Sequence, residues 1–130
     1  MTPTNRLISL YHGGRKVLVD TISGYGLNQE KIFYCSRQRS LADAAADSFG
    51  IDGRVLKIDL PASIFSRGIA EGFFEERLYL GSIPIDYALE VVVKPGRGID
   101  IINHALLFSQ RPWEETEFFL PLILNTRTPI

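Results

Sequence analysis

A histidine ends one of the alternating apolar and polar segments of this chain. In ISLYHGG, His12 follows Ile8 and Leu10 at two-residue spacing, so it shares the apolar face of a predicted strand that stops at this point. Gly13 and Gly14 come next, and without a side chain they let a ligand or another strand approach the backbone closely. A glycine pair after a strand is also typical of an ordinary turn, so both interpretations stay open.

A tyrosine and a glutamate occupy comparable positions in two later segments. In KIFYCS, Tyr34 is in phase with Ile32, and its ring could line an apolar slot. In FFEERLYL, Glu76 is in phase with Phe74 whereas Glu75 is not. A carboxylate drawn toward an apolar face needs a hydrogen-bonding partner. Packing would equally explain the tyrosine, and a solvated strand edge would explain the two glutamates.

Five strands and two helices are expected to position these side chains. Alternation predicts the strands at about 7–12, 31–36, 54–60, 76–81 and 87–94. One helix is predicted from a cap at Ser40 to a stop at Gly50, and another over 98–109. The segment 113–124 is ambiguous because Pro121 interrupts it. Strands that follow one another without long helical connections favour an antiparallel α+β domain.

Length and composition narrow the possible classes of protein. The 130 residues are expected to form a single domain, 1–130, and a formal net charge of −1 gives no sign of a nucleic-acid-binding surface. The single cysteine, Cys35, excludes an internal disulfide and a cysteine-cluster zinc site. His104 has no second ligand at metal-binding spacing, so we expect no metal. No apolar run is long enough for a leader or a membrane helix.

Taken in order, the motifs resemble those of the ADP-ribosyltransferase superfamily. The match is to its His-Tyr-Glu branch, that of diphtheria toxin and the poly-ADP-ribose polymerases. It rests on YHG, on FYCS before an alanine-rich helix, on VLKIDLP, and on the glutamate that opens ERLYLGSIPIDYALEV, and it covers residues 8–94. The resemblance implies an ADP-ribosyltransferase-like α+β fold, in which two small antiparallel sheets with flanking helices surround a cleft for NAD.

The resemblance also implies roles for individual residues, with NAD as co-substrate. His12 would hydrogen-bond the adenosine-side ribose, the backbone of Gly13 would meet the nicotinamide carboxamide, and Tyr34 would stack on the nicotinamide ring. Ser36, from the same motif as Tyr34, would belong to the NAD site. Glu76 would be the catalytic carboxylate, which stabilises the positive charge that develops on the ribose as nicotinamide leaves.

Two further sets of residues follow from the family pattern. Members of this branch carry a second aromatic residue about eleven positions after the tyrosine; this chain has Ala45 there, and Phe49 one helical turn later is the candidate replacement. Residues just before the catalytic glutamate shape acceptor choice in related transferases. Phe73, Phe74 and Glu75 are therefore candidates for contacting the acceptor, although a hairpin that simply packs would have the same residues.

The resemblance, carried by His12, Tyr34 and Glu76 in this order, implies a mono-ADP-ribosyltransferase acting on a macromolecular acceptor, with a protein favoured over a nucleic acid. The family's habits imply a toxin, effector or conflict-system protein, cytoplasmic in its own cell or delivered into a target cell, with no membrane partner. A neutralising antitoxin or immunity protein is then an expected partner. Two alternatives stay open: an NAD glycohydrolase, and a catalytically silent domain of the same fold that binds a nucleotide or a protein.

Overall fold

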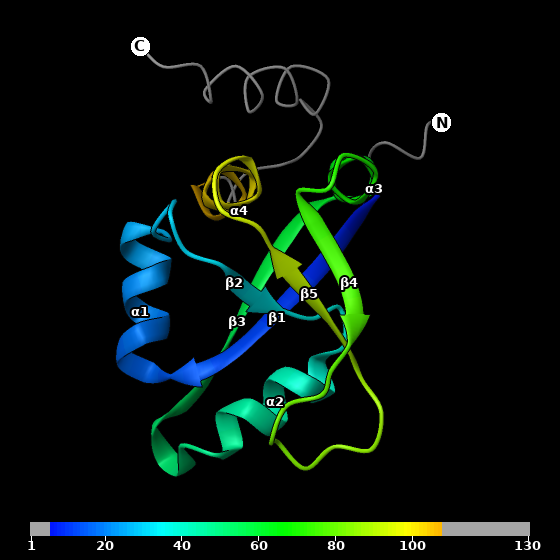
Figure 1. The fold of residues 1–130 in the computed structure, drawn as a ribbon. Coiled ribbons are helices and arrows are strands. Elements are labelled where there is room, and N and C mark those ends of the chain that lie inside the picture. Colours follow the sequence, from blue (N-terminus) through cyan, green and yellow to red (C-terminus); the bar gives the residue numbers. More distant parts are fainter. Residues whose placement is uncertain (1–5, 108–130) are drawn as a thin grey trace.

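Two small antiparallel sheets and four α-helices make up residues 6–107, the part of the chain that the computed structural model describes (Figure 1). In chain order the elements are β1 (Leu7–Arg15), α1 (Lys16–Tyr25), β2 (Phe33–Cys35), α2 (Arg39–Asp47), the 3-10 helix η2 (Gly50–Asp52), β3 (Gly53–Pro61), α3 (Ala62–Ala70), β4 (Phe74–Leu78), β5 (Leu89–Val93) and α4 (Arg97–Leu107). Helices α3 and α4 lie toward one end of the strands, and α2 lies at the other (Figure 1).

The two sheets are joined at one point. Strands β1 and β3 pair along their full length, with Leu7 opposite Pro61 and Arg15 opposite Gly53. The second sheet has the order β2-β5-β4. An isolated bridge links the sheets: the backbone N–H of Tyr11 donates to the carbonyl of Ser36 at 2.7 Å, and the N–H of Ser36 donates back at 2.9 Å. The expected α+β class with small antiparallel sheets is thereby confirmed.

Several element boundaries differ from the sequence prediction. Strand β1 does not stop at the glycines but continues through them to Arg15, because each is paired with a residue of β3. Helices α1 and α3 were not predicted. They connect β1 to β2 and β3 to β4, so these two connections are helical and not the short ones on which the antiparallel prediction was based. The predicted segment 113–124 lies outside the described residues, as does the end of the helix expected over 98–109.

Helix α2 also begins and ends elsewhere than expected. Its N-cap residue is Gln38 and makes no side-chain capping hydrogen bond, so Ser40 is not the cap. The helix ends at Asp47, and Gly50 instead opens η2 with a φ of 59°, a backbone conformation that favours glycine. The loss of the predicted cap is explained by tertiary contacts, because α2 is held by its packing on the β1–β3 pair.

One hydrophobic core lies between the sheets and the helices. The alternation of β1 is borne out: Leu10 is fully buried, and Ile8 packs against the same cluster. In the second sheet, Phe74 of β4 stacks on Phe65 of α3 with ring centroids 5.6 Å apart. Phe33, in register with Phe74 through β5, lies on the same buried face. The core therefore fixes which face of each strand is left for other contacts.

Candidate functional site

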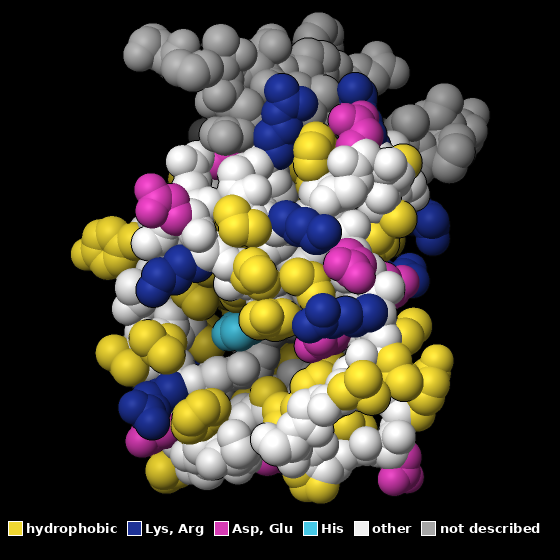
Figure 2. Space-filling view, viewed as in Figure 1, with side chains coloured by type: hydrophobic (Ala, Val, Ile, Leu, Met, Phe, Trp, Pro, Cys, Tyr) yellow, Lys and Arg dark blue, Asp and Glu magenta, His cyan; other side chains and the backbone are white. Residues whose placement is uncertain are grey.

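A pocket of about 110 Å³ lies where the two sheets meet. Its walls come from β1, β2, α2, β5 and the segment between β4 and β5. Its lining residues are Tyr11, His12, Gly13, Tyr34, Cys35, Ser36, Leu41, Ala42, Ala45, Tyr79, Ile83 and Glu90. Two of the predicted motifs are thus brought together, with His12 and Gly13 from one and Tyr34 and Ser36 from the other. Figure 2 shows a histidine among hydrophobic side chains, with basic and acidic side chains close by.

The His12 ring is held in one orientation by two contacts. Its Nδ1 lies 2.8 Å from the carbonyl oxygen of Tyr34, and its ring centroid lies 4.6 Å from that of Phe33. A carbonyl can only accept, so Nδ1–H is the donor and Nε2 of the neutral ring remains an acceptor. Burial lowers the pKa of His12 from its ordinary value of 6.5, against the smaller raising effect of the bond to Tyr34. A neutral His12 could accept a hydrogen bond from a ligand hydroxyl.

The lowered pKa of His12 predicts that acid destabilises the fold. Below the ordinary pKa of 6.5, the unfolded chain binds a proton at this site that the folded chain resists. The free energy of unfolding should therefore rise with pH through this window and level off above it. Urea unfolding of wild type and His12→Gln at about pH 5 and pH 7.5 measures the effect, because the two proteins differ at residue 12 alone. An equal pH dependence in the two proteins would contradict the prediction.

Tyr34 and Ser36 contribute to the pocket in different ways. The Tyr34 side chain is 46% exposed, and the Arg77 guanidinium carbon lies 5.9 Å from the centre of its ring. Ser36 is buried; its hydroxyl donates to the carbonyl of Leu89 at 2.6 Å and accepts from the N–H of Gln38 at 2.9 Å. Tyr34 therefore offers a free ring face, whereas Ser36 ties β2 to β5 and to the start of α2.

Gly13 lies where a helix packs closely on a strand backbone. A β-carbon at Gly13 would overlap the carbonyl oxygen of Ala42. A β-carbon at Gly53, which pairs with Arg15 two residues further along β1, would overlap the carbonyl oxygen of Ala46. The small residues of α2 therefore rest directly on the strand backbones, an approach that only glycine permits. The close approach that was expected at this glycine is thus made by a helix, and the contact of the Gly13 backbone with a ligand stays a prediction, since that backbone lines the pocket.

Glu76 lies on the face predicted from its phase but not in this pocket. It is opposite Val91 of β5, which in turn is opposite Cys35, so its side chain is on the buried face of the sheet. Arg37 binds both carboxylate oxygens, with Nε 3.0 Å from Oε2 and Nη2 2.8 Å from Oε1. Tyr34 is on the opposite face, opposite Val92 and, across it, Glu75. The structure thus does not bring Glu76 together with Tyr34.

The predicted acceptor-contacting residues are divided between core and surface. Phe74 is 2% exposed and packs on Phe65, so it is not available to an acceptor, contrary to the prediction. Phe73 packs against the core, with the Arg97 guanidinium carbon 5.8 Å from its ring centre. Glu75 is exposed and forms an ion pair of 3.6 Å with Lys94. Of the three, Glu75 alone keeps a solvent-facing side chain.

Tyr79, an aromatic residue that sequence reasoning missed, lines the pocket in addition to Tyr34. Phe49 does not line the pocket; it lies under the guanidinium group of Arg15, whose carbon is 5.3 Å from the ring centre. Ala45 does line the pocket, and so does Tyr79, whose hydroxyl accepts a hydrogen bond from the N–H of Ile83 at 3.0 Å. Tyr79 follows β4, so residue spacing counted from Tyr34 into α2 could not have identified it.

A larger hollow adjoins the pocket. It measures about 600 Å³ and shares Tyr34, Tyr79 and Glu90 with it, while Arg77 and residues 78 and 80–81 complete its lining. The smaller pocket has room for one ring, whereas the hollow has the size typical of ligand sites. Together they could hold a ligand that has a planar end group and a longer body.

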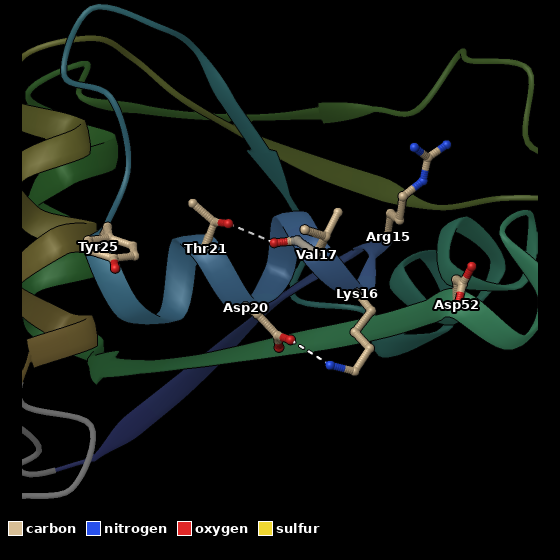
Figure 3. Close-up of a pocket in the computed structure, with 7 residues that line it drawn as sticks. All are labelled: Arg15, Lys16, Val17, Asp20, Thr21, Tyr25 and Asp52. Atoms are coloured by element: carbon tan, nitrogen blue, oxygen red, sulfur yellow. Dashed lines mark hydrogen bonds and ion pairs between the residues drawn. The ribbon is translucent and has the colours of Figure 1, made fainter.

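A third hollow, of about 430 Å³, lies beside α1 (Figure 3). The figure shows that some of its polar groups bind one another. Lys16 forms an ion pair with Asp20 at 2.8 Å, and the Thr21 hydroxyl donates a hydrogen bond to the carbonyl of Val17 at 2.7 Å. Neither His12 nor Tyr34 lines it. It is therefore distinct from the candidate site.

Cys35 lines the pocket but offers it no ready nucleophile. Cys35 is buried, and desolvation raises the pKa of its thiol, with a smaller contribution from the charge of Glu90. A protonated thiol is a poor nucleophile. Among residues 6–107, no group of three or more histidine, cysteine or acidic side chains is placed to hold a metal ion. The same residues include no helix with the length and apolarity needed to cross a membrane.

Comparisons with known proteins add no family to this description. No protein-family model, no curated protein and no solved structure matches the chain.

Proposed function

We propose that this protein is an ADP-ribosyltransferase that cleaves NAD and transfers a single ADP-ribose unit to a macromolecular acceptor, a protein rather than a nucleic acid. The observation that carries the proposal is the gathering of His12, Gly13, Tyr34 and Ser36 around one pocket. These residues come from two segments that are separated along the chain, and the resemblance to the His-Tyr-Glu transferases selected both segments from the sequence alone. The two small antiparallel sheets are compatible with the ADP-ribosyltransferase-like fold that the proposal requires.

The arrangement suits the binding of NAD in three respects. The exposed Tyr34 ring offers a stacking surface for nicotinamide, and Tyr79 adds a second aromatic wall. Neutral His12 leaves Nε2 free to accept a hydrogen bond from a ribose hydroxyl. The adjoining hollow has space for the rest of the dinucleotide. Further proposals follow from the family rather than from these contacts: a toxin or effector role in a cytoplasm, and a neutralising protein partner.

One observation favours a second candidate function. Arg37 occupies both oxygens of Glu76, the residue that the resemblance assigns to catalysis, and Glu76 is outside the pocket. A domain that keeps the nucleotide-binding pocket but has lost the catalytic carboxylate would bind a nucleotide or a protein without turning over NAD.

Incubation with NAD labelled in its adenosine half tests the proposal. Purified protein is incubated with and without cell lysate, and the product is digested separately with protease and with nuclease. We expect protease-sensitive label on lysate macromolecules, together with released nicotinamide. Nicotinamide release that is undiminished without lysate, and without label transfer, would identify a glycohydrolase. If the protein neither transfers label nor releases nicotinamide, the transferase proposal is wrong and the silent binder remains.

A further inference from the structure

Glu90 is the acidic side chain that lines the pocket containing His12 and Tyr34. Strand β5 passes between β2 and β4, with Val92 opposite Tyr34 and Glu90 two residues away on the same strand. Residues two apart on a strand project from the same face, so Glu90 and Tyr34 share a face of the sheet. Glu90 lies within the segment ERLYLGSIPIDYALEV, but the resemblance gave the catalytic role to the glutamate that opens this segment, so no sequence signal selected Glu90.

The surroundings of Glu90 hold its carboxylate in place without covering all of it. The side chain is 12% exposed, and Oε2 accepts a hydrogen bond from Nε of Arg77 at 2.9 Å. Arg77 is directly opposite Glu90 on β4, and its guanidinium group also lies over the ring of Tyr34. Because Glu90 lines both the pocket and the adjoining hollow, it lies where the two spaces meet.

Glu76 is also paired with an arginine, and its side chain is the more exposed of the two at 21%, but it differs from Glu90 in its face of the sheet and in how its oxygens are bound. Both of its oxygens are bound by Arg37, and Arg37 is itself packed on Phe65, with its guanidinium carbon 5.3 Å from the ring centre. Its side chain is on the buried face with Phe74. A carboxylate with two satisfied oxygens on that face serves to attach β4 to the segment between β2 and α2.

We infer that Glu90 is the carboxylate that contacts the nicotinamide ribose of NAD in this pocket and stabilises its positive charge, with Arg77 as its positioning residue. This inference rests on the proposed function. In the reaction, the bond between the ribose C1′ and the nicotinamide nitrogen breaks, and its electron pair leaves with neutral nicotinamide. The acceptor's nucleophilic atom then forms the new bond to C1′ and releases its proton to water. A fixed carboxylate beside C1′ stabilises the intermediate charge more than the ground state.

Glutamine substitutions at the two carboxylates test this assignment. Steady-state nicotinamide release is measured for wild type, Glu90→Gln and Glu76→Gln, and NAD affinity is measured by calorimetry. Glu90→Gln should lower kcat by about 10²–10³-fold, the loss typical of removing one preorganised electrostatic group. NAD affinity should stay within about threefold, because glutamine keeps the shape of the side chain. Glu71→Gln is the matched control, since Glu71 is paired with Arg67 on α3 and does not line the pocket.

The outcomes separate the inference from the proposed function. Loss of kcat in Glu76→Gln with full activity in Glu90→Gln would overturn the assignment and leave the transferase intact. A wild-type protein that does not turn over NAD would overturn both. Should Glu90→Gln fail to fold, Glu90→Asp decides the question: it keeps the charge but withdraws the carboxylate by one methylene. We expect it to lower kcat at least tenfold, and an unchanged kcat would refute the assignment.

Discussion

Replacing Gly13 by alanine is expected to lower the free energy of unfolding by about 3 kcal/mol, the upper end of the usual cost of overpacking. The new methyl group would overlap the carbonyl oxygen of Ala42 and meet the backbone N–H of Ala46. These are backbone atoms of a packed helix, so α2 must shift as a body rather than turn a side chain aside. Urea unfolding measures the loss.

Gly24→Ala is the matched control for this prediction. A β-carbon at Gly24 of α1 would meet no atom within 4 Å. The substitution should stabilise the protein by about 0.5 kcal/mol, because alanine has a higher helix propensity than glycine and lowers the conformational entropy of the unfolded chain. Because α2 supplies Leu41, Ala42 and Ala45 to the pocket, Gly13→Ala should also weaken NAD binding. Equal stability of the two variants would mean that α2 does not rest on the β1 backbone as described.

Tyr34→Ala is expected to raise the KM for NAD at least about fivefold while leaving the stability nearly unchanged. Stacking of a base-like ring on an aromatic side chain contributes about 1–3 kcal/mol, and the Tyr34 ring is exposed rather than part of the core. Tyr34→Phe keeps the stacking surface and should restore a near-normal KM. The measurement is nicotinamide release over a range of NAD concentrations.

Tyr25→Ala provides the control for Tyr34→Ala. Tyr25 is 91% exposed on α1 and lines the separate hollow beside that helix. Its removal should leave the KM unchanged. If both alanine variants shift the KM equally, or if neither does, Tyr34 does not stack on the nicotinamide.

Local patterns predicted the strand faces well. Two-residue alternation correctly placed His12 with Leu10 and Glu76 with Phe74, because successive side chains of a strand must project to opposite faces. Helix α4 was also predicted, since its three-and-four spacing of apolar residues is long and regular. Helices α1 and α3, which are short and mix polar with apolar residues, were not predicted.

Features that depend on contacts between distant segments could not be predicted in this way. The Ser40 cap was wrong because packing on Gly13 and Gly53 holds α2 without a capping side chain. Phe49 is outside the pocket, and Tyr79 provides the aromatic wall because a loop distant in sequence folds over it. The residue pattern of α2 cannot indicate where that loop lies in the folded protein.

The amino-acid sequence was sufficient to determine the α+β class and the face of each strand on which the candidate side chains lie, since both follow from short-range periodicity. It was also sufficient to select four residues that share a pocket. The choice between Glu76 and Glu90 required the strand order β2-β5-β4, which places Glu90 on the face of Tyr34 and Glu76 on the other face with Arg37. Phase relates residues within one strand, whereas the faces of different strands become comparable only when their pairing register is known.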